Sequence, residues 1–359
     1  MTAFDEVLDS ASVIVACGPG GVGKTTTSAA LGLAAARRGR RVVVVTVDPA
    51  RRLADALGVT DLGNEPTQVR AEGTDGLHAV MLDAQTTFDR LVRLQAPTVA
   101  QAEAILANPM YRNIAGSLSG TQEYMAVEKL YELDQSEDFD LVIVDTPPSR
   151  NAIDLLEAPG RMVRFLEHPL YRLLTAPSRA GMKVLAGTAR VFLRTVQRVA
   201  GGEVVDDAIA FFQAFAGMED GFRDRAAQVD ELLRADGTSF VVVSSPRAEA
   251  ITESTHLAKE LRARDLRIET VVVNMLHEQL PPVAVPDDVP DAVTGLAARH
   301  RQLARLADRE RTEVRPLLAA APGAALVEVP LLDDDVHDVE TLGAVADALL
   351  ADLGSLGGR

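Results

Sequence analysis

The chain has one cysteine, Cys17, no tryptophan and no long uninterrupted apolar run. A single cysteine excludes an internal disulfide and the paired cysteines that hold zinc or a soft metalloid. Because no stretch reaches about 18 consecutive apolar residues, we expect no membrane-spanning helix. Residues 1–10 are acidic and lack the apolar core of a secretory signal. We therefore expect a cytoplasmic protein that is at most peripheral to a membrane.

Basic residues are scarce relative to acidic ones. The 359 residues include 36 Lys and Arg against 52 Asp and Glu, so the formal net charge is −16. Such a charge repels nucleic acid at long range, and we expect no nucleic-acid partner. The remaining composition, 47% hydrophobic and 25% charged, is typical of a globular chain that buries a sizeable core.

Short apolar runs rich in β-branched residues alternate with longer helical patterns along much of the chain. This alternation predicts an α/β fold with a doubly wound, mostly parallel sheet. Several runs are continuously apolar, which favours strands covered by helices on both faces. The predicted strands are residues 12–17, 41–47, 77–82, 139–145, 240–244, 268–274 and 325–329. The predicted helices between them include residues 24–38, 247–264 and 339–351.

Two stretches interrupt this alternation because they contain helical patterns without a convincing strand, residues 86–137 and 150–236. The second is too long for a simple crossover between strands, so we predict an inserted helical subdomain at residues 151–236. The sheet domain is then predicted to consist of residues 1–85, 138–150 and 237–359, with a separate helical segment at residues 86–137.

The strongest local signal is a glycine-rich loop between the first predicted strand and the first predicted helix. Its sequence, GPGGVGKT at residues 18–25, satisfies the pattern G-x-x-x-x-G-K-[ST]. Glycines let backbone N–H groups surround phosphates, and the helix N-terminus adds partial positive charge. Lys24 is expected to reach the β- and γ-phosphates, and Thr25 to place its hydroxyl on Mg²⁺. The pattern predicts a P-loop NTPase that binds ATP and Mg²⁺ through Gly20, Gly21, Val22, Gly23, Lys24, Thr25 and Thr26.

Two aspartates follow predicted strands, and parallel strands place their carboxyl ends at one edge of a sheet. Asp145 ends the apolar run FDLVIVD and is expected to hold the Mg²⁺ shell, although a strand-ending Asp is also a common turn residue. Asp48 opens DPARR and is expected to orient the attacking water, the alternative being a helix N-cap. Lys24 and Asp48 are thus the candidate catalytic residues, and Thr25 and Asp145 the candidate metal ligands.

These elements together resemble the arsenite-pump and tail-anchored-protein-targeting ATPases, a branch of the deviant Walker A group. The resemblance is carried by residues 18–26, by DPARRLADAL at residues 48–57 and by DTPPSRNAIDLLEAP at residues 145–159. It extends to Asn274 at a strand end and to Pro330 with the acidic run after it. The inserted helices occupy the place where that family has its client-binding subdomain.

The resemblance implies roles for the matching positions. Asp48 would be the switch I residue that activates water, and Asp145 would open switch II. Asn274 would read the adenine edge, the alternative being a strand-end turn residue. The loop at residues 330–335, beginning with Pro330, would close over the base.

Three departures from the family pattern limit what the resemblance implies. The family's signature lysine, which reaches the partner's phosphates across a dimer, is replaced here by Pro19. The zinc-binding cysteine pair of the targeting ATPases and the metalloid-binding cysteines of the arsenite pumps are both absent. We therefore expect no thiolate-based arsenite transport.

The absent lysine leaves two hypotheses for the assembly. Three segments resemble actinobacterial members of the family: the sequence around Pro19, TQEY at residues 121–124 and PPSR at residues 147–150. Those members tend to occur as non-identical pairs. The chain is then either one half of a heterodimer with a related ATPase subunit that carries the lysine, or a homodimer with slow hydrolysis.

A basic amphipathic helix is predicted at residues 183–199. Its basic side contains Lys183, Arg190, Arg194 and Arg198, and its apolar side Leu185, Ala189, Phe192, Val196 and Val199. The helix either covers the core or contributes to a client groove or a membrane contact, with residues 208–212 and Phe215 as a further apolar lining. The preferred function is an ATPase that times the handling of a protein or membrane client. The alternatives are an ATP-dependent dimerisation switch with little hydrolysis and a DNA-partition ATPase, which the acidic charge disfavours.

Overall fold

The computed structural model describes residues 3–48, 50–109, 111, 120–147, 149–169, 171, 210–284 and 290–351. The chain divides into two compact units. The first, here the sheet unit, comprises Met1–Met81, Glu132–Ile153 and Arg234–Arg359. The second, here the helical unit, comprises Leu82–Tyr131 and Asp154–Leu233.

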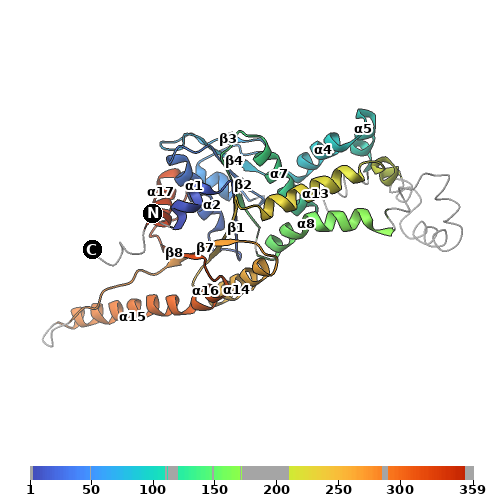
Figure 1. Ribbon diagram of the computed structural model, residues 1–359. Helices are drawn as coiled ribbons and strands as arrows, with labels where there is room; N and C mark the ends of the chain where they lie inside the picture. Colours follow the sequence, from blue (N-terminus) through green and yellow to red (C-terminus); the bar gives the residue numbers. More distant parts are fainter. Residues whose placement is uncertain are drawn as a thin grey trace. The chain divides into compact units, whose positions relative to one another are not determined.

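The sheet unit is built on an eight-stranded sheet with the order β3-β4-β2-β5-β1-β6-β7-β8 (Figure 1). All neighbouring strands are parallel except β3 and β4. The order changes direction at β1, because the chain passes from β1 to β2 and β4 on one side and later to β6 on the other. The strands are β1 Val13–Cys17, β2 Val42–Thr46, β3 Thr67–Gln68, β4 Leu77–Met81, β5 Leu141–Asp145, β6 Thr238–Ser244, β7 Ile268–Leu276 and β8 Ala325–Pro330.

Helices cover both faces of this sheet (Figure 1). One layer packs α2 (Lys24–Arg37) against α17 (Val339–Leu350), α3 (Arg52–Leu57) and α1 (Ala3–Ser10). The other layer contains α14 (Ala248–Ala263) and α16 (Arg315–Ala320), and α15 (Asp291–Glu313) precedes α16 and contacts it. Because both faces are covered, β1, β2, β5 and β6 are buried along their whole length.

The central helix α2 lies close to the sheet because it is rich in small residues. Its middle is the run Leu31–Ala36, which includes Gly32. A Cβ atom at Gly32 would lie 2.6 Å from Cγ2 of Val44 in β2. The helix therefore depends on glycine at the point where it crosses the strand that precedes Asp48.

The helical unit contains α4 (Ala84–Gln95), α5 (Val99–Ala107), and most of α7 (Thr121–Gln135), α8 (Ser149–Glu167) and α13 (Glu219–Arg234). No strand occurs among the residues described there. Within it, Arg225 donates from Nε to Glu128 at 2.8 Å and stacks over the ring of Tyr131 at 3.9 Å. This pairing lets a charged residue of α7, Glu128, lie buried inside the unit.

The predicted α/β class with a mostly parallel sheet is confirmed, and each predicted strand is present with one or both ends shifted by one or two residues. The unpredicted strand β3 has only two residues and no apolar run to mark it. The two predicted helical stretches, residues 86–137 and 151–236, contribute to one unit, whose boundaries fall at other residues. The predicted basic helix at residues 183–199 lies outside the described residues.

Candidate nucleotide and magnesium site

The register of three neighbouring strands brings the candidate site residues together. In the parallel ladders, Asp145 at the end of β5 lies opposite Ala16 of β1 and Thr46 of β2. The segments that follow these strands are the glycine-rich loop, the Asp48 segment and the turn before α8. They therefore meet at one edge of the sheet, where the strand order changes direction, and ligands of open parallel sheets bind at such a point.

The glycine-rich loop has the backbone conformation that its sequence predicts. Gly21 and Gly23 have φ angles of 72° and 89°, a region in which a side chain is strained. At Gly23, which precedes α2, a Cβ atom would also lie 2.2 Å from Nδ2 of Asn274. The loop thus leaves room for backbone N–H groups, and not side chains, to face a ligand.

Lys24 is a buried cation of this loop. Its ammonium group donates a hydrogen bond to the carbonyl of Pro19 at 2.8 Å. Burial lowers the pKa of Lys24, while the nearby carboxylate of Asp145 opposes that shift. The lysine is therefore a desolvated positive charge, whose interaction with an anion is stronger than at a solvated surface.

Asp145 is the centre of the hydrogen-bond network. Thr25 and Thr46 both donate from Oγ1 to its Oδ2 oxygen, at 2.7 Å and 3.0 Å. Its other oxygen, Oδ1, is buried and has no hydrogen-bond partner among the described residues. Burial raises the pKa of Asp145 to about 6, and the two threonine hydroxyls and Lys24 act in the opposite direction.

This donor set fits a magnesium ion bound together with phosphate. Mg²⁺ takes only one or two protein oxygens and keeps several waters, and a buried carboxylate oxygen with free lone pairs is a suitable acceptor for such waters. Thr25 would hold the ion through its hydroxyl, and Asp145 would hold its water shell. No cluster of three or more His, Cys, Asp or Glu side chains that would bind a metal unaided is found among the described residues.

Asp48 lies at the same edge with its carboxylate already engaged. Its Oδ1 accepts from the backbone N–H of Ala50 at 2.9 Å, and its Oδ2 lies 3.7 Å from Nη1 of Arg52. The N-cap of α3 is Arg51 and not Asp48. The side chain lines the cavity described next, so the structure is compatible with the water-orienting role, which stays a prediction.

Two adjoining cavities mark the space for a nucleotide. The first, of about 380 Å³, is lined by residues of the glycine-rich loop, Asp48, Asp145 and the turn at Thr146 and Pro147. The second, of about 580 Å³, is lined by Asn274 and by the loop from Pro330 to Val336. Both are lined by Gly23, Thr26, Arg52, Met275 and Val336. A ligand whose phosphates occupy the first can therefore extend its base into the second.

Asn274 and Val22, two of the binding residues predicted from the sequence, are themselves held by contacts within the protein. The Asn274 amide donates to the carbonyl of Val22 at 3.0 Å and accepts from the N–H of Met275 at 2.9 Å. The side chain of Val22 is buried in the core below the loop. Asn274 thus braces the glycine-rich loop and also faces the cavity in which an adenine would lie.

Three residues of the site were not identified from the sequence. Thr46 binds Asp145, and Arg247 donates to the carbonyl of Gly21 at 3.0 Å. Met275, between the two cavities, has a φ angle of 64°, and the pairing of β7 with β8 is irregular beside it. Only Thr46 had a signal in the sequence, as a threonine that ends an apolar strand. Arg247 and Met275 had none, because their roles depend on contacts between segments distant in sequence.

The cysteine of the chain lies below this site and is chemically protected. Cys17 is 1% exposed and lies 3.6 Å from the carbonyl of Val241. Burial raises the pKa of its thiol to about 12, so almost no thiolate forms at neutral pH.

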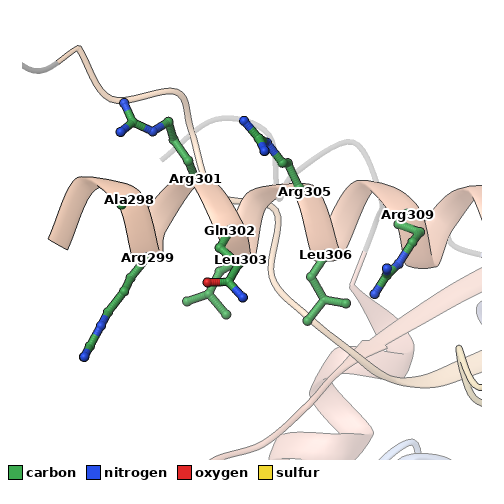
Figure 2. A pocket seen from close by; sticks show the side chains of 8 residues that line it. All are labelled: Ala298, Arg299, Arg301, Gln302, Leu303, Arg305, Leu306 and Arg309. Atoms are coloured by element: carbon green, nitrogen blue, oxygen red, sulfur yellow. The ribbon is translucent and has the colours of Figure 1, made fainter. Parts of the chain in front are cut away.

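A separate hollow of about 740 Å³ runs along α15 (Figure 2). Its lining includes four arginines, but Figure 2 shows Arg301 and Arg305 on one side of the helix and Arg299 and Arg309 directed elsewhere. Because these guanidinium groups do not converge on a common point, we assign no anion site to the hollow.

Comparison with known proteins identifies the family of the chain. The family model described as "Anion-transporting ATPase" matches residues 11–351. The chain is 28% identical over 340 residues to "ATPase ARSA2" of Chlamydomonas reinhardtii, covering 93% of this chain and 82% of that protein. It is 27% identical to "ATPase GET3" of Malassezia globosa, covering 97% and 94%, and 25% identical to "ATPase GET3A" of Arabidopsis thaliana, covering 96% and 86%.

The parallel sheet, the glycine-rich loop and the carboxylate beside it define a P-loop ATPase. Within that class, the chain belongs to the anion-transporting ATPase family. The family resemblance drawn from the sequence is thereby confirmed. No helix among the described residues is long and apolar enough to cross a bilayer.

Asp145→Asn is expected to stabilise the free protein while abolishing its response to Mg-ATP. Replacing the buried carboxylate by a neutral amide removes the cost of burying a charge, about 1–3 kcal/mol. Loss of the charge that holds the metal shell removes the ligand-dependent rise in the unfolding midpoint. Thermal unfolding with and without Mg-ATP measures both effects. Asp140→Asn, which removes the exposed partner of Arg41 beside the same strand, is the control and should keep the response; a full response in Asp145→Asn would contradict the assignment.

Asn274→Ala is expected to weaken ATP binding by roughly 10-fold, because the lost amide leaves a loop carbonyl without its donor. The variant is also expected to lower the ratio of ATP affinity to GTP affinity, because the two nucleotides differ only in the base. Titration of both nucleotides by calorimetry measures the two effects separately. If both nucleotides weaken equally, Asn274 only braces the loop and its adenine-reading role is wrong.

Proposed function

We propose that the chain is a Mg-ATP-dependent ATPase whose nucleotide state drives a dimer rearrangement and the handling of a protein or membrane client in the cytoplasm. The observation that carries the proposal is the network at Asp145, where the ends of β2 and β5 and the start of α2 meet through two short hydrogen bonds. Any change at the metal or the phosphates alters this network before it alters more distant parts of the chain.

The roles of the residues follow from their positions. The glycines and Lys24 bind the phosphates, Thr25 and Asp145 hold the metal and its water shell, and Asp48 orients the attacking water. When bound, Mg²⁺ neutralises charge on the phosphate oxygens. The low exposure of Lys24 and Asp145 favours strong electrostatic interactions in this site.

The chain connectivity supports a link from this site to the helical unit. Only Thr146, Pro147 and Pro148 separate Asp145 from α8, which begins at Ser149. That helix starts in the sheet unit and continues from Asp154 in the helical unit. A helix transmits displacement better than a loop, so a change of the turn at Thr146 is expected to move the client-handling helices.

The nature of the client is argued from chemistry and from relatives. Several relatives are named ATPase GET3, and the resemblance to tail-anchored-protein-targeting ATPases favours a protein or membrane client over a free anion. Arsenite transport through thiolates is disfavoured because Cys17, the single thiol, is buried and kept protonated.

Pro19 bears on catalytic power and on assembly. It stands where the family has a lysine that reaches the partner's phosphates, and a proline has no charge to donate. We favour a heterodimer with a related subunit that supplies this lysine. The second candidate is an ATP-binding dimerisation switch with little hydrolysis of its own, for which the same substitution is the supporting observation.

The purified chain is expected to hydrolyse ATP slowly with Mg²⁺ and not at all as Lys24→Ala. At protein concentrations that drive self-association, Pro19→Lys should raise kcat by at least about 10-fold, because in a dimer each copy then adds a positive charge at the other copy's transferred phosphate. Pro19→Ala is the matched control, since it removes the proline without adding charge, and should leave the slow rate unchanged. Arsenite in the same assay is expected to change none of these rates. Equal rates in Pro19→Lys and Pro19→Ala would contradict the proposed role of the missing lysine.

Light scattering with Mg-ATP decides between the assemblies. The chain alone is expected to stay largely monomeric, and to form a stable pair when mixed with a related subunit that has lysine at the position of Pro19. A tight self-dimer that is indifferent to that subunit would overturn the heterodimer. Nucleotide-dependent dimerisation with negligible turnover in every mixture would favour the switch.

A further inference from the structure

The helical unit contains an apolar cavity that is separate from every residue of the nucleotide site. Its volume is about 170 Å³. The lining comes from α4, α7 and α8 and from the segment around residues 211–215, all within one unit. Six aromatic side chains line it, Phe88, Tyr124, Phe165, Tyr171, Phe211 and Phe215.

All of these rings except Tyr124 belong to one connected cluster, which is completed by Tyr111 and Phe212. Phe211 lies 5.0 Å from Phe215 between ring centroids, and Phe165 lies 5.3 Å from Tyr171. Phe211 and Phe215 are 3% and 5% exposed. The cavity walls are therefore held in place by aromatic packing, as in preformed ligand pockets.

One polar group in the lining has no partner. Tyr124 is 2% exposed, and its hydroxyl has no hydrogen-bond partner among the described residues. The other tyrosines near the cavity differ, because Tyr111 donates to Asp89 at 2.6 Å and Tyr171 donates to Glu219 at 3.4 Å. An unsatisfied buried hydroxyl costs roughly 1–3 kcal/mol, so its presence here points to a ligand that accepts from it.

The described lining of the cavity contains one charged residue, Arg161, and that residue is paired. Burial raises the pKa of Tyr124 far above its usual range, so the phenol stays protonated and can donate. Arg161, which also lines the cavity, forms ion pairs with Asp154 and with Glu157, the latter at 3.1 Å. Its charge is compensated, and the cavity therefore does not favour an anion.

The size of the cavity limits the ligand. An engineered apolar cavity of roughly 150 Å³ stays dry and binds benzene. We propose that this cavity binds a small uncharged apolar molecule, the size of one ring or a short acyl chain, whose single hydrogen-bond acceptor receives the Tyr124 hydroxyl. A side chain of a bound client is the other conceivable occupant, and the test below separates the two.

The test uses a matched pair of probes that differ in the acceptor. Acetophenone has a carbonyl and ethylbenzene does not, while their shapes are nearly equal. Calorimetry on the full chain should give roughly 3- to 10-fold tighter binding of acetophenone, the range of one net hydrogen bond. Tyr124→Phe should bind both probes equally, because it keeps the ring and removes the donor.

Two further variants complete the design. Tyr171→Phe also removes a hydroxyl from the cavity lining, but one that is already bonded, so it should keep the preference for acetophenone. Ala158→Phe fills the cavity and should abolish binding of both probes, with cooperative unfolding as the check that it folds.

Three results would overturn the proposal. They are no binding of either probe to the wild-type chain, equal binding of both, or a preference that survives in Tyr124→Phe. If neither probe binds while an apolar helical peptide does, the cavity accommodates a client side chain instead. None of these measurements depends on ATP hydrolysis, so failure here leaves the proposed ATPase function untouched.

Discussion

One carboxylate oxygen of Asp145 accepts hydrogen bonds from the hydroxyls of Thr25 and Thr46, and the site depends on this interaction. It joins the end of β2 to the start of α2 through the end of β5. The interaction exists only because the parallel register places Thr46 opposite Asp145. The same carboxylate is buried, and its second oxygen has no partner among the described residues, so the free protein carries an unfavourable group that a bound ligand can satisfy. Stability is reduced at the point where binding is required, as is common for functional sites.

The helical unit also has a buried polar group without a partner among the described residues, and there the group is a hydroxyl instead of a carboxylate. Its aromatic residues line a space that the described residues do not fill, and the Tyr124 hydroxyl has no partner among those residues. Among the described residues of the unit, Arg225 and Glu128 are the contrasting case, because these two buried polar groups satisfy each other. Buried polar groups without partners are exceptions in folded proteins, and in both units one lines a cavity.

The fold and the phosphate-binding loop could be predicted because their signals are local. A continuous apolar run marks a covered strand, and GPGGVGKT combines the backbone freedom of glycine with the charge of Lys24 in eight neighbouring residues. The partners of these residues were not predictable in the same way. Arg247 meets Gly21 and Asn274 meets Val22 only after distant segments are folded together, and the unpaired hydroxyl of Tyr124 is defined by the packing around it. Strand β3 escaped prediction because it consists of two polar residues held by its neighbour's ladder.

The protected state of Cys17 has a practical consequence. Its thiol is shielded and protonated, and the chain contains no tryptophan, so the natural protein presents neither a reactive sulfur nor an indole signal. A cysteine introduced at the surface would be the single labelling position, and an introduced tryptophan the single indole fluorophore. A dye on such a cysteine in one unit and a tryptophan in the other would then report their separation without removal of the native Cys17. The proposed motion of α8 during nucleotide turnover is thereby open to direct optical measurement.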